Sequence, residues 1–81
     1  MDPAIQKKIS VLFEPNSLTH LRVKEKDVAV KSDAEGNAMF AFVGKLNEDG
    51  NIKGERYTRV LVKDKDGKII KDHWDLKGKA S

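Results

Sequence analysis

Three short stretches that combine an acidic or amide residue with glycine constrain the fold of this chain more than any other feature. They are DAEGN at 33–37, EDGN at 48–51 and DKDG at 64–67. Each supplies a glycine where a β-hairpin turn requires a positive φ angle, next to residues that favour turns. Runs of alternating apolar and polar residues lie on both sides of every stretch. The chain is therefore predicted to form an antiparallel meander, in which each strand turns back beside the previous one.

The strands follow from the period-two alternation of apolar residues. In the run 21–30 the apolar positions switch from odd to even across KEKD at 24–27, which predicts a turn or bulge there. The later runs are AMFAFVGKL at 38–46, YTRVLV at 57–62 and IIKDHWDL at 69–76. We expect a curved sheet over about residues 19–76, with four strands, or five if a short first strand forms. A short polar tail at 77–81 is expected to follow it.

The N-terminal segment has the pattern of one amphipathic helix. Asp2 can cap the free N–H groups of a helix start, and Pro3 at the first helical position has no N–H to leave unpaired. The apolar residues that follow share one helical stripe and are Ile5, Ile9, Leu12 and Phe13. Pro15 ends the segment, because the residue before a proline is pushed out of the α region. We predict a helix over about residues 3–13 and a single small α+β domain over 1–81.

The register of the last two hairpins decides which side chains share a face, because a slip of one residue sends every side chain to the other face. A type I turn at 64–67 places apolar residues opposite apolar ones and Arg59 opposite Asp72. A two-residue turn would set Arg59 against Trp74, so the longer loop is preferred. For the preceding hairpin we expect a two-residue turn at 49–50. The predicted pairs include Val62 with Ile69, Tyr57 with Trp74, Phe42 with Tyr57 and Phe40 with Arg59.

This register divides the apolar residues between two faces of the sheet. The aromatic face contains Phe40, Phe42, Tyr57, Arg59, Leu61, Ile70, Asp72 and Trp74. The aliphatic face contains Val28, Val30, Met39, Ala41, Val43, Val60, Val62 and Ile69. One short helix covers only one face, and apolar surface left in water forfeits about 25 cal/mol per Å². We therefore predict a homodimer that packs aliphatic faces together, with Val28, Val30, Met39, Val43, Val60, Val62 and Ile69 in the interface.

The aromatic face contains the sharpest candidate for a ligand site. Its candidate residues are Tyr57, Arg59, Asp72, Trp74, Phe40 and Phe42. A guanidinium there can hold an anionic or carbonyl ligand, and a carboxylate shielded by aromatic rings can acquire the shifted pKa of a general base. The alternative, which we favour, is a cross-strand salt bridge between Arg59 and Asp72 that supports the hairpin. His73 falls on the other face, so it forms no dyad with its neighbour Asp72.

Charge and composition exclude several classes of function. The net charge is +3, but lysines alternate with acids in KEKD and KDKDGK, which indicates a mixed solvated surface and disfavours nucleic acid as a partner. Cysteine is absent and the two histidines are far apart, so neither a disulfide nor a metal site is predicted. No apolar signal region or membrane-length run occurs. We predict a cytoplasmic protein with no cofactor, no membrane partner and no assigned catalytic residue.

The strand GERYTRV at 54–60, the turn at Gly67 and the closing strand with His73-Trp74 form a pattern with a known likeness. Residues 27–76 resemble the last strands of the SnoaL-like and nuclear-transport-factor-2-like superfamily, a cystatin-like α+β roll. The likeness covers the C-terminal strands only, so the chain resembles a truncated member. It implies a curved sheet around a conical pocket and dimerisation through the sheet. Members include polyketide cyclases, ketosteroid isomerases and dehydratases, beside many non-enzymatic binding domains.

Three functions fit these observations. The first is a small, dimeric, non-catalytic module that binds a protein or a small hydrophobic ligand. The second is a small-molecule binder, or an isomerase-like or cyclase-like enzyme, that uses Tyr57, Arg59, Asp72 and Trp74. The third is an adaptor or inhibitor of the kind carried by phages and mobile elements, which the sequence does not separate from the first.

Overall fold

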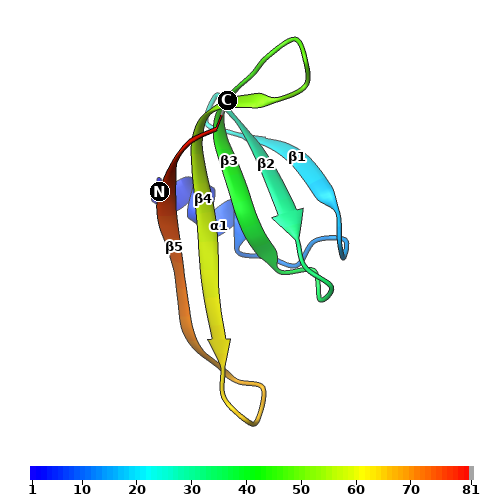
Figure 1. Cartoon of the computed structure of the whole chain (residues 1–81), viewed down its shortest axis with the longest axis vertical. Helices are drawn as coiled ribbons and strands as arrows, with labels where there is room; N and C mark the ends of the chain where they lie inside the picture. The colour runs from blue at the N-terminus through cyan, green and yellow to red at the C-terminus, as the bar shows by residue number, and fades with distance from the viewer. Residues whose placement is uncertain (81) are drawn as a thin grey trace.

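The computed structural model describes residues 1–80 and has one short helix packed on a five-stranded antiparallel sheet (Figure 1). The strands lie side by side in chain order, as predicted for a meander. The fold is therefore α+β, and the short first strand forms. The elements are α1 (Pro3–Ile9), β1 (Leu18–Val23), β2 (Lys26–Ser32), β3 (Ala38–Leu46), β4 (Ile52–Lys63) and β5 (Ile69–Ala80). The predicted polar tail is part of β5 up to Ala80, and Ser81 lies outside the described residues.

The helix begins as predicted and ends earlier. The Asp2 carboxylate accepts a hydrogen bond of 2.8 Å from the N–H of Ala4, and Pro3 occupies the first turn. The helix ends at Ile9, so the prediction that it reaches residue 13 is wrong. The reason is a tertiary contact: Leu12 forms a β-bridge with Asn37, and the chain must leave the helical path to reach it. Leu12 is consequently 73% exposed instead of lying on the buried stripe.

Three of the four hairpin loops are built in the same way. The loops begin at Asp33, Asn47 and Asp64 and each spans five residues. In each, the side-chain oxygen of the first residue accepts hydrogen bonds of 2.9–3.0 Å from the N–H groups of the third and fifth residues. The fourth residue is a glycine at a φ of 83–88°, where a side chain would be strained. The loops are therefore fixed by one asparagine or aspartate and one glycine apiece.

The remaining hairpin, between β1 and β2, turns through two residues. Val23 pairs with Lys26, so Lys24 and Glu25 form the turn that the KEKD pattern indicated. Their φ angles are 47° and 67°, as a type I′ turn requires at both central positions. Residues with a Cβ atom are disfavoured there, so this turn stores backbone strain.

The five-residue loops change the predicted register. Because Asn47 pairs with Asn51, the β3–β4 hairpin sets Ala41 opposite Tyr57 and Phe42 opposite Arg56, one residue away from the prediction. The predicted pairing of Phe42 with Tyr57 is wrong, since the two-residue turn it assumed does not form. All side chains of β4 and β5 therefore change faces relative to those of β3.

The β4–β5 register also differs from the prediction, by two residues. Asp64 pairs with Lys68, and a β-bulge follows in β5. Lys63 pairs with Ile69 and Val62 pairs with Lys71, which leaves Ile70 as the extra residue. As a result Arg59 lies opposite Trp74, and the predicted pairing of Arg59 with Asp72 is wrong. A shift of two keeps side chains on their own faces, so Arg59, Asp72 and Trp74 remain together.

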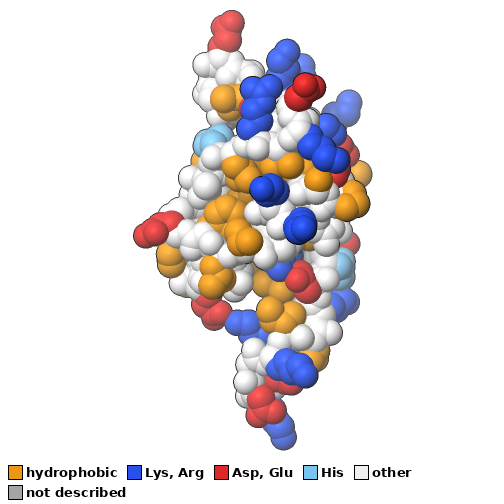
Figure 2. Space-filling view, turned by 180° about the vertical axis from the view of Figure 1, so that it is seen from behind, with side chains coloured by type: hydrophobic (Ala, Val, Ile, Leu, Met, Phe, Trp, Pro, Cys, Tyr) orange, Lys and Arg blue, Asp and Glu red, His pale blue; other side chains and the backbone are white. Residues whose placement is uncertain are grey.

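The core lies between α1 and one face of the sheet. Its fully buried side chains include Ile5 and Ile9 of the helix and Val28 and Val30 of β2. Trp74 and Phe13 are half-buried against them. Figure 2 views this helix-covered side, where apolar and basic side chains lie next to one another over the middle of the molecule. The other face of the sheet, which we call the open face, has no helix over it in the part of the chain that the structure describes (Figure 1).

A pair of glycines lets the β3–β4 hairpin bend over the open face. Gly44 lies directly opposite Gly54. A Cβ atom on Gly44 would collide with the carbonyl oxygen of Lys53, and one on Gly54 would collide with that of Val43. Only glycine permits this close approach of the two backbones. Past this pair the hairpin reaches across the sheet, since its residues line one groove with residues of β1.

Candidate functional site

The ion pair predicted from the sequence forms, although its residues lie diagonally across the ladder. The Nε and Nη2 atoms of Arg59 each donate a hydrogen bond of 2.7 Å to Asp72. The Nη1 atom donates to the carbonyl oxygen of Ala38 at 3.3 Å, and the guanidinium carbon lies 5.6 Å from the centre of the Trp74 ring. The Arg59 side chain is 8% exposed, so this guanidinium is a buried component of the fold.

The chemistry of this cluster is that of a structural ion pair. Hydrogen bonding from Arg59 lowers the pKa of the Asp72 carboxyl, which burial partly opposes and the Arg59 charge reinforces. The pKa of Tyr57 is raised by burial and then by the charge of Glu55, whose carboxylate accepts from the Tyr57 hydroxyl at 3.3 Å. Asp72 is therefore a weaker base than an ordinary carboxylate. All three nitrogens of the Arg59 side chain already have protein acceptors.

The six predicted ligand residues do not form one site. Tyr57, Arg59 and Trp74 lie on the helix side, with Asp72 beside them. Phe40 and Phe42 occupy the open face instead, because the β3–β4 register differs by one residue from the predicted one. The aromatic cluster is thus divided by the sheet itself.

The predicted dimer residues are also divided between the two faces. Val28, Val30 and Val43 are buried beneath α1, together with the half-buried Met39 of β3. Val60 and Val62 lie on the open face with Phe40. Ile69 pairs with Lys63 at the far end of the sheet and is exposed. These seven residues therefore do not make up one continuous surface.

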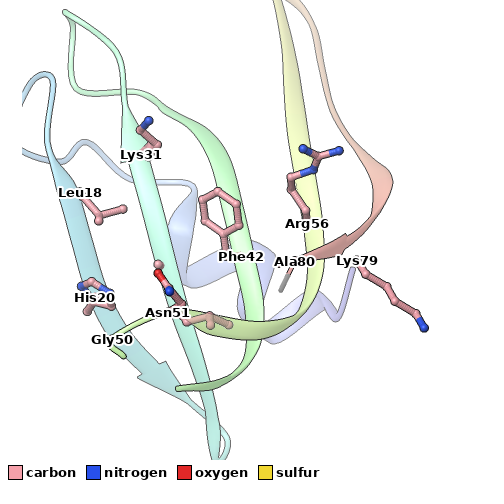
Figure 3. Close-up of a pocket in the computed structure, with 11 residues that line it drawn as sticks. Leu18, His20, Lys31, Phe42, Gly50, Asn51, Arg56, Lys79 and Ala80 are labelled. Atoms are coloured by element: carbon pink, nitrogen blue, oxygen red, sulfur yellow. The ribbon is translucent and has the colours of Figure 1, made fainter. Parts of the chain in front are cut away.

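A groove of about 430 Å³ lies on the open face (Figure 3). Leu18, Ala29 and Phe42 form its apolar floor, while Ile52 and Ala80 close one end. The bend at the glycine pair produces this closure, because it brings the hairpin over the strands. In Figure 3 the Phe42 ring stands between the strands that line the groove, and α1 lies behind the sheet.

The charged groups around the groove are all of one sign. They are Lys31 of β2 and Arg56 of β4, with the imidazole of His20 of β1 beside them. Lys79 of β5 also contributes to the lining, but its side chain points away from the groove in Figure 3. Among residues 1–80 the groove lining includes neither Asp nor Glu. The salt bridges within residues 1–80 are Arg59–Asp72, Lys63–Glu35 and His73–Asp75, and none of them includes a cation of the groove. The groove offers an apolar floor with unpaired positive charge at its sides.

The register arranges the open face around the groove in two rows across the sheet. One row runs His20, Ala29, Phe42, Arg56. The next runs Leu18, Lys31, Phe40, Thr58, of which Phe40 and Thr58 lie beyond the groove lining. Sequence reasoning missed Arg56, because the assumed two-residue turn pairs Phe42 with Tyr57. Asn47 is the signal that places Arg56, since it starts a five-residue loop that sets Phe42 opposite Arg56. Lys31 was missed because its position depends on the register between β2 and β3.

The remaining candidate sites offer less than the groove. His73 and Asp75 form a half-exposed pair on the open face, with 3.2 Å between Nε2 and Oδ1. No group of three His, Cys, Asp or Glu side chains within residues 1–80 is placed to hold a metal ion. The described helix is also too short to span a membrane.

Comparison of this chain with protein-family models, with curated protein sequences and with solved structures returned no match.

Proposed function

We propose that this protein is a small non-catalytic binding module whose recognition surface is the open face of the sheet. The observation that carries the proposal is the groove on that face, in which unpaired cations surround an apolar floor. Binding sites typically combine an apolar surface with a few convergent polar groups. Here the convergent groups are the side chains of His20, Lys31 and Arg56. The ligand is therefore expected to combine negative charge with an apolar or aromatic body.

The enzyme-like alternative, built on Tyr57, Arg59, Asp72 and Trp74, receives less support. A catalytic guanidinium must present donors to a substrate, whereas the three nitrogens of Arg59 have protein acceptors. A general base benefits from a raised pKa, whereas that of Asp72 is lowered. The cluster is better explained as a structural contact that holds β5 against β4.

A homodimer through the open face is the second candidate. Exposed apolar side chains on this face support it, among them Leu18, Phe40 and Val62. The unpaired cations argue against it, because a second copy would bring the same charges into contact. Sedimentation velocity at low and high salt measures the association directly. A dimer that strengthens as salt screens the cations is the expected behaviour if this candidate holds.

The likeness of residues 27–76 to a truncated SnoaL-like roll remains part of the proposal. Its support is the order of the strands and the place of His73 and Trp74 in the last strand. The proposed recognition surface differs from a pocket enclosed by the sheet and its helix, because it lies on the side of the sheet away from α1.

Backbone amide mapping by NMR tests the proposed function. The protein is titrated with a panel of small amphipathic anions and with their neutral analogues. We expect the anions to shift the amides of His20, Phe42 and Arg56 and to leave that of Trp74 in place. Shifts centred on Trp74 and Arg59 would instead establish the alternative site, and a panel without any shift on the open face would refute the proposal.

A further inference from the structure

We propose that the open face binds single-stranded nucleic acid, with Phe40 and Phe42 stacking against bases and Lys31 and Arg56 holding phosphates. This inference rests on the proposed function, because it assigns a ligand class to the same face. The sequence by itself disfavours nucleic acid, since its lysines alternate with acids. In the folded chain Asp75 lies on the open face opposite Thr58, but the groove itself is lined by basic side chains and, among residues 1–80, by no Asp or Glu.

The open face presents two phenylalanines on one strand, Phe40 and Phe42 of β3, which we call the aromatic platform. Phe40 and Phe42 alternate with the core residue Ala41, so both project from the open face about 7 Å apart along β3. Phe40 is 44% exposed, so its ring is accessible to a ligand. Aromatic rings on an open sheet face are the surface on which unpaired bases stack, and stacking tolerates any base.

The cations flank this platform on both sides. Lys31 of β2 lies directly opposite Phe40, and Arg56 of β4 lies directly opposite Phe42. The two charges are therefore separated by two strand spacings across the sheet and two residues along it, about 12 Å on the diagonal, with the rings between them. His20 extends the same row to β1. A polymer with regularly spaced negative charges matches this distribution better than a compact anion, which would need the cations to converge on one point.

The shape of the groove favours a single strand over a duplex. The β3–β4 hairpin bends over one end, where Gly50, Asn51 and Ile52 line the groove together with Leu18 and His20. Bases that stack on Phe40 and Phe42 must also be unpaired, since a duplex buries their faces against neighbouring base pairs. A second copy of this chain is disfavoured because its cations would face these cations. An acidic peptide offers the charge but no planar ring system, so it becomes a competing outcome of the test.

Fluorescence anisotropy with the whole 81-residue chain tests the inference. The probes are a fluorescein-labelled 15-nucleotide thymidine oligomer, the same oligomer in duplex form, and labelled polyglutamate. We expect the single strand to bind more tightly than either other probe, with an affinity that falls as salt rises from 50 to 200 mM. Arg56→Ala should weaken binding and reduce the slope of log affinity against log salt by about 0.7. Phe40→Leu should weaken binding about fivefold or more and leave that slope unchanged.

Lys8→Ala is the matched control, since it removes the same charge from the last turn of α1. We expect it to leave the affinity within about twofold of the parent, in keeping with a site on the other side of the sheet. Circular dichroism melting of each variant establishes that it is folded. Equal losses in Lys8→Ala and Arg56→Ala would overturn the inference, as would a duplex or polyglutamate that binds as tightly as the single strand. If oligonucleotides fail while small amphipathic anions still shift the open-face amides, nucleic acid is the wrong ligand and the proposed function survives.

Discussion

Arg59 and Asp72 are joined by two parallel hydrogen bonds of 2.7 Å, even though the residue directly opposite Arg59 in the ladder is Trp74. The diagonal geometry lets the Arg59 guanidinium lie near the Trp74 ring while it donates hydrogen bonds to the Asp72 carboxylate. Charge-assisted bidentate pairs are among the stronger hydrogen bonds in proteins. The pair therefore fixes β5 to β4 from the buried side of the hairpin.

Breaking this pair should cost stability and spare ligand binding. Arg59→Met removes the buried guanidinium, and we expect the free energy of unfolding to fall by about 1–2 kcal/mol, since Asp72 is partly exposed and can be solvated. Urea unfolding measures the loss. Binding of any open-face ligand should be unchanged at temperatures where the variant is folded. Reduced ligand affinity in a fully folded Arg59→Met variant would show that the Arg59–Asp72 cluster takes part in binding.

The same pair predicts a pH dependence of stability. The pKa of Asp72 is lowered in the folded state, chiefly by hydrogen bonding from Arg59, so its contribution is complete above the unfolded pKa of about 3.9. It is lost as the pH falls through the lower folded value. The difference in melting temperature between the parent and Asp72→Asn should therefore be largest near pH 7 and shrink below about pH 4. In an Arg59→Met background the difference should be small at every pH, which provides the control.

The glycine pair under the bend should tolerate no side chain. Gly44→Ala places a Cβ atom against the carbonyl oxygen of Lys53, so the two strands must separate. We expect a loss of about 2 kcal/mol or more, together with amide shifts in Ile52 and Ala80 as the groove closure opens. Gly67→Ala is the comparison, because it has a φ of 83° but no neighbour within 4 Å of an added Cβ. Gly67→Ala should lower the free energy of unfolding by only about 1 kcal/mol, the cost of backbone strain alone. Equal costs would show that the close approach is unimportant.

The β1–β2 turn should be open to improvement. Glu25 has a φ of 67°, which glycine adopts without strain. We expect Glu25→Gly to raise the free energy of unfolding by about 0.5–1 kcal/mol, as measured by chemical denaturation. Glu48→Gly is the control, because Glu48 lies in a hairpin loop and is not among the residues of positive φ within residues 1–80. The control should be neutral or destabilising, and a gain there equal to that of Glu25→Gly would contradict the strain argument.

The sequence predicted the elements well because their signals are local. Asp2 and Pro3 mark the helix start, and the glycines at 36, 50 and 67 mark three of the four hairpin loops. Register was harder, because it depends on whether the residue before each turn joins the loop. Asn47 does so by accepting two backbone N–H groups, and that single residue decides the face on which Phe42 meets Arg56.

Other features depended on contacts that no local pattern contains. The helix ends early because Leu12 bridges to Asn37, a residue in a distant loop. The bulge near Lys63 adds a further residue to the β4–β5 ladder without any glycine to mark it. The basic side chains of the groove come from four strands, so they could be grouped only after all four registers were known.

The three like-built loops also bear on how the chain reaches its fold. Every strand pairs with its neighbour in sequence, and each of these loops closes through hydrogen bonds among five consecutive residues. The sheet can therefore assemble hairpin by hairpin without first closing a long segment, which favours rapid folding for a β-rich protein. The contact between Leu12 and Asn37 links residues separated by two strands and must wait for the β2–β3 hairpin. We therefore expect the helical segment to dock late, and mutations in it to act mainly on the rate of unfolding measured by stopped-flow denaturation.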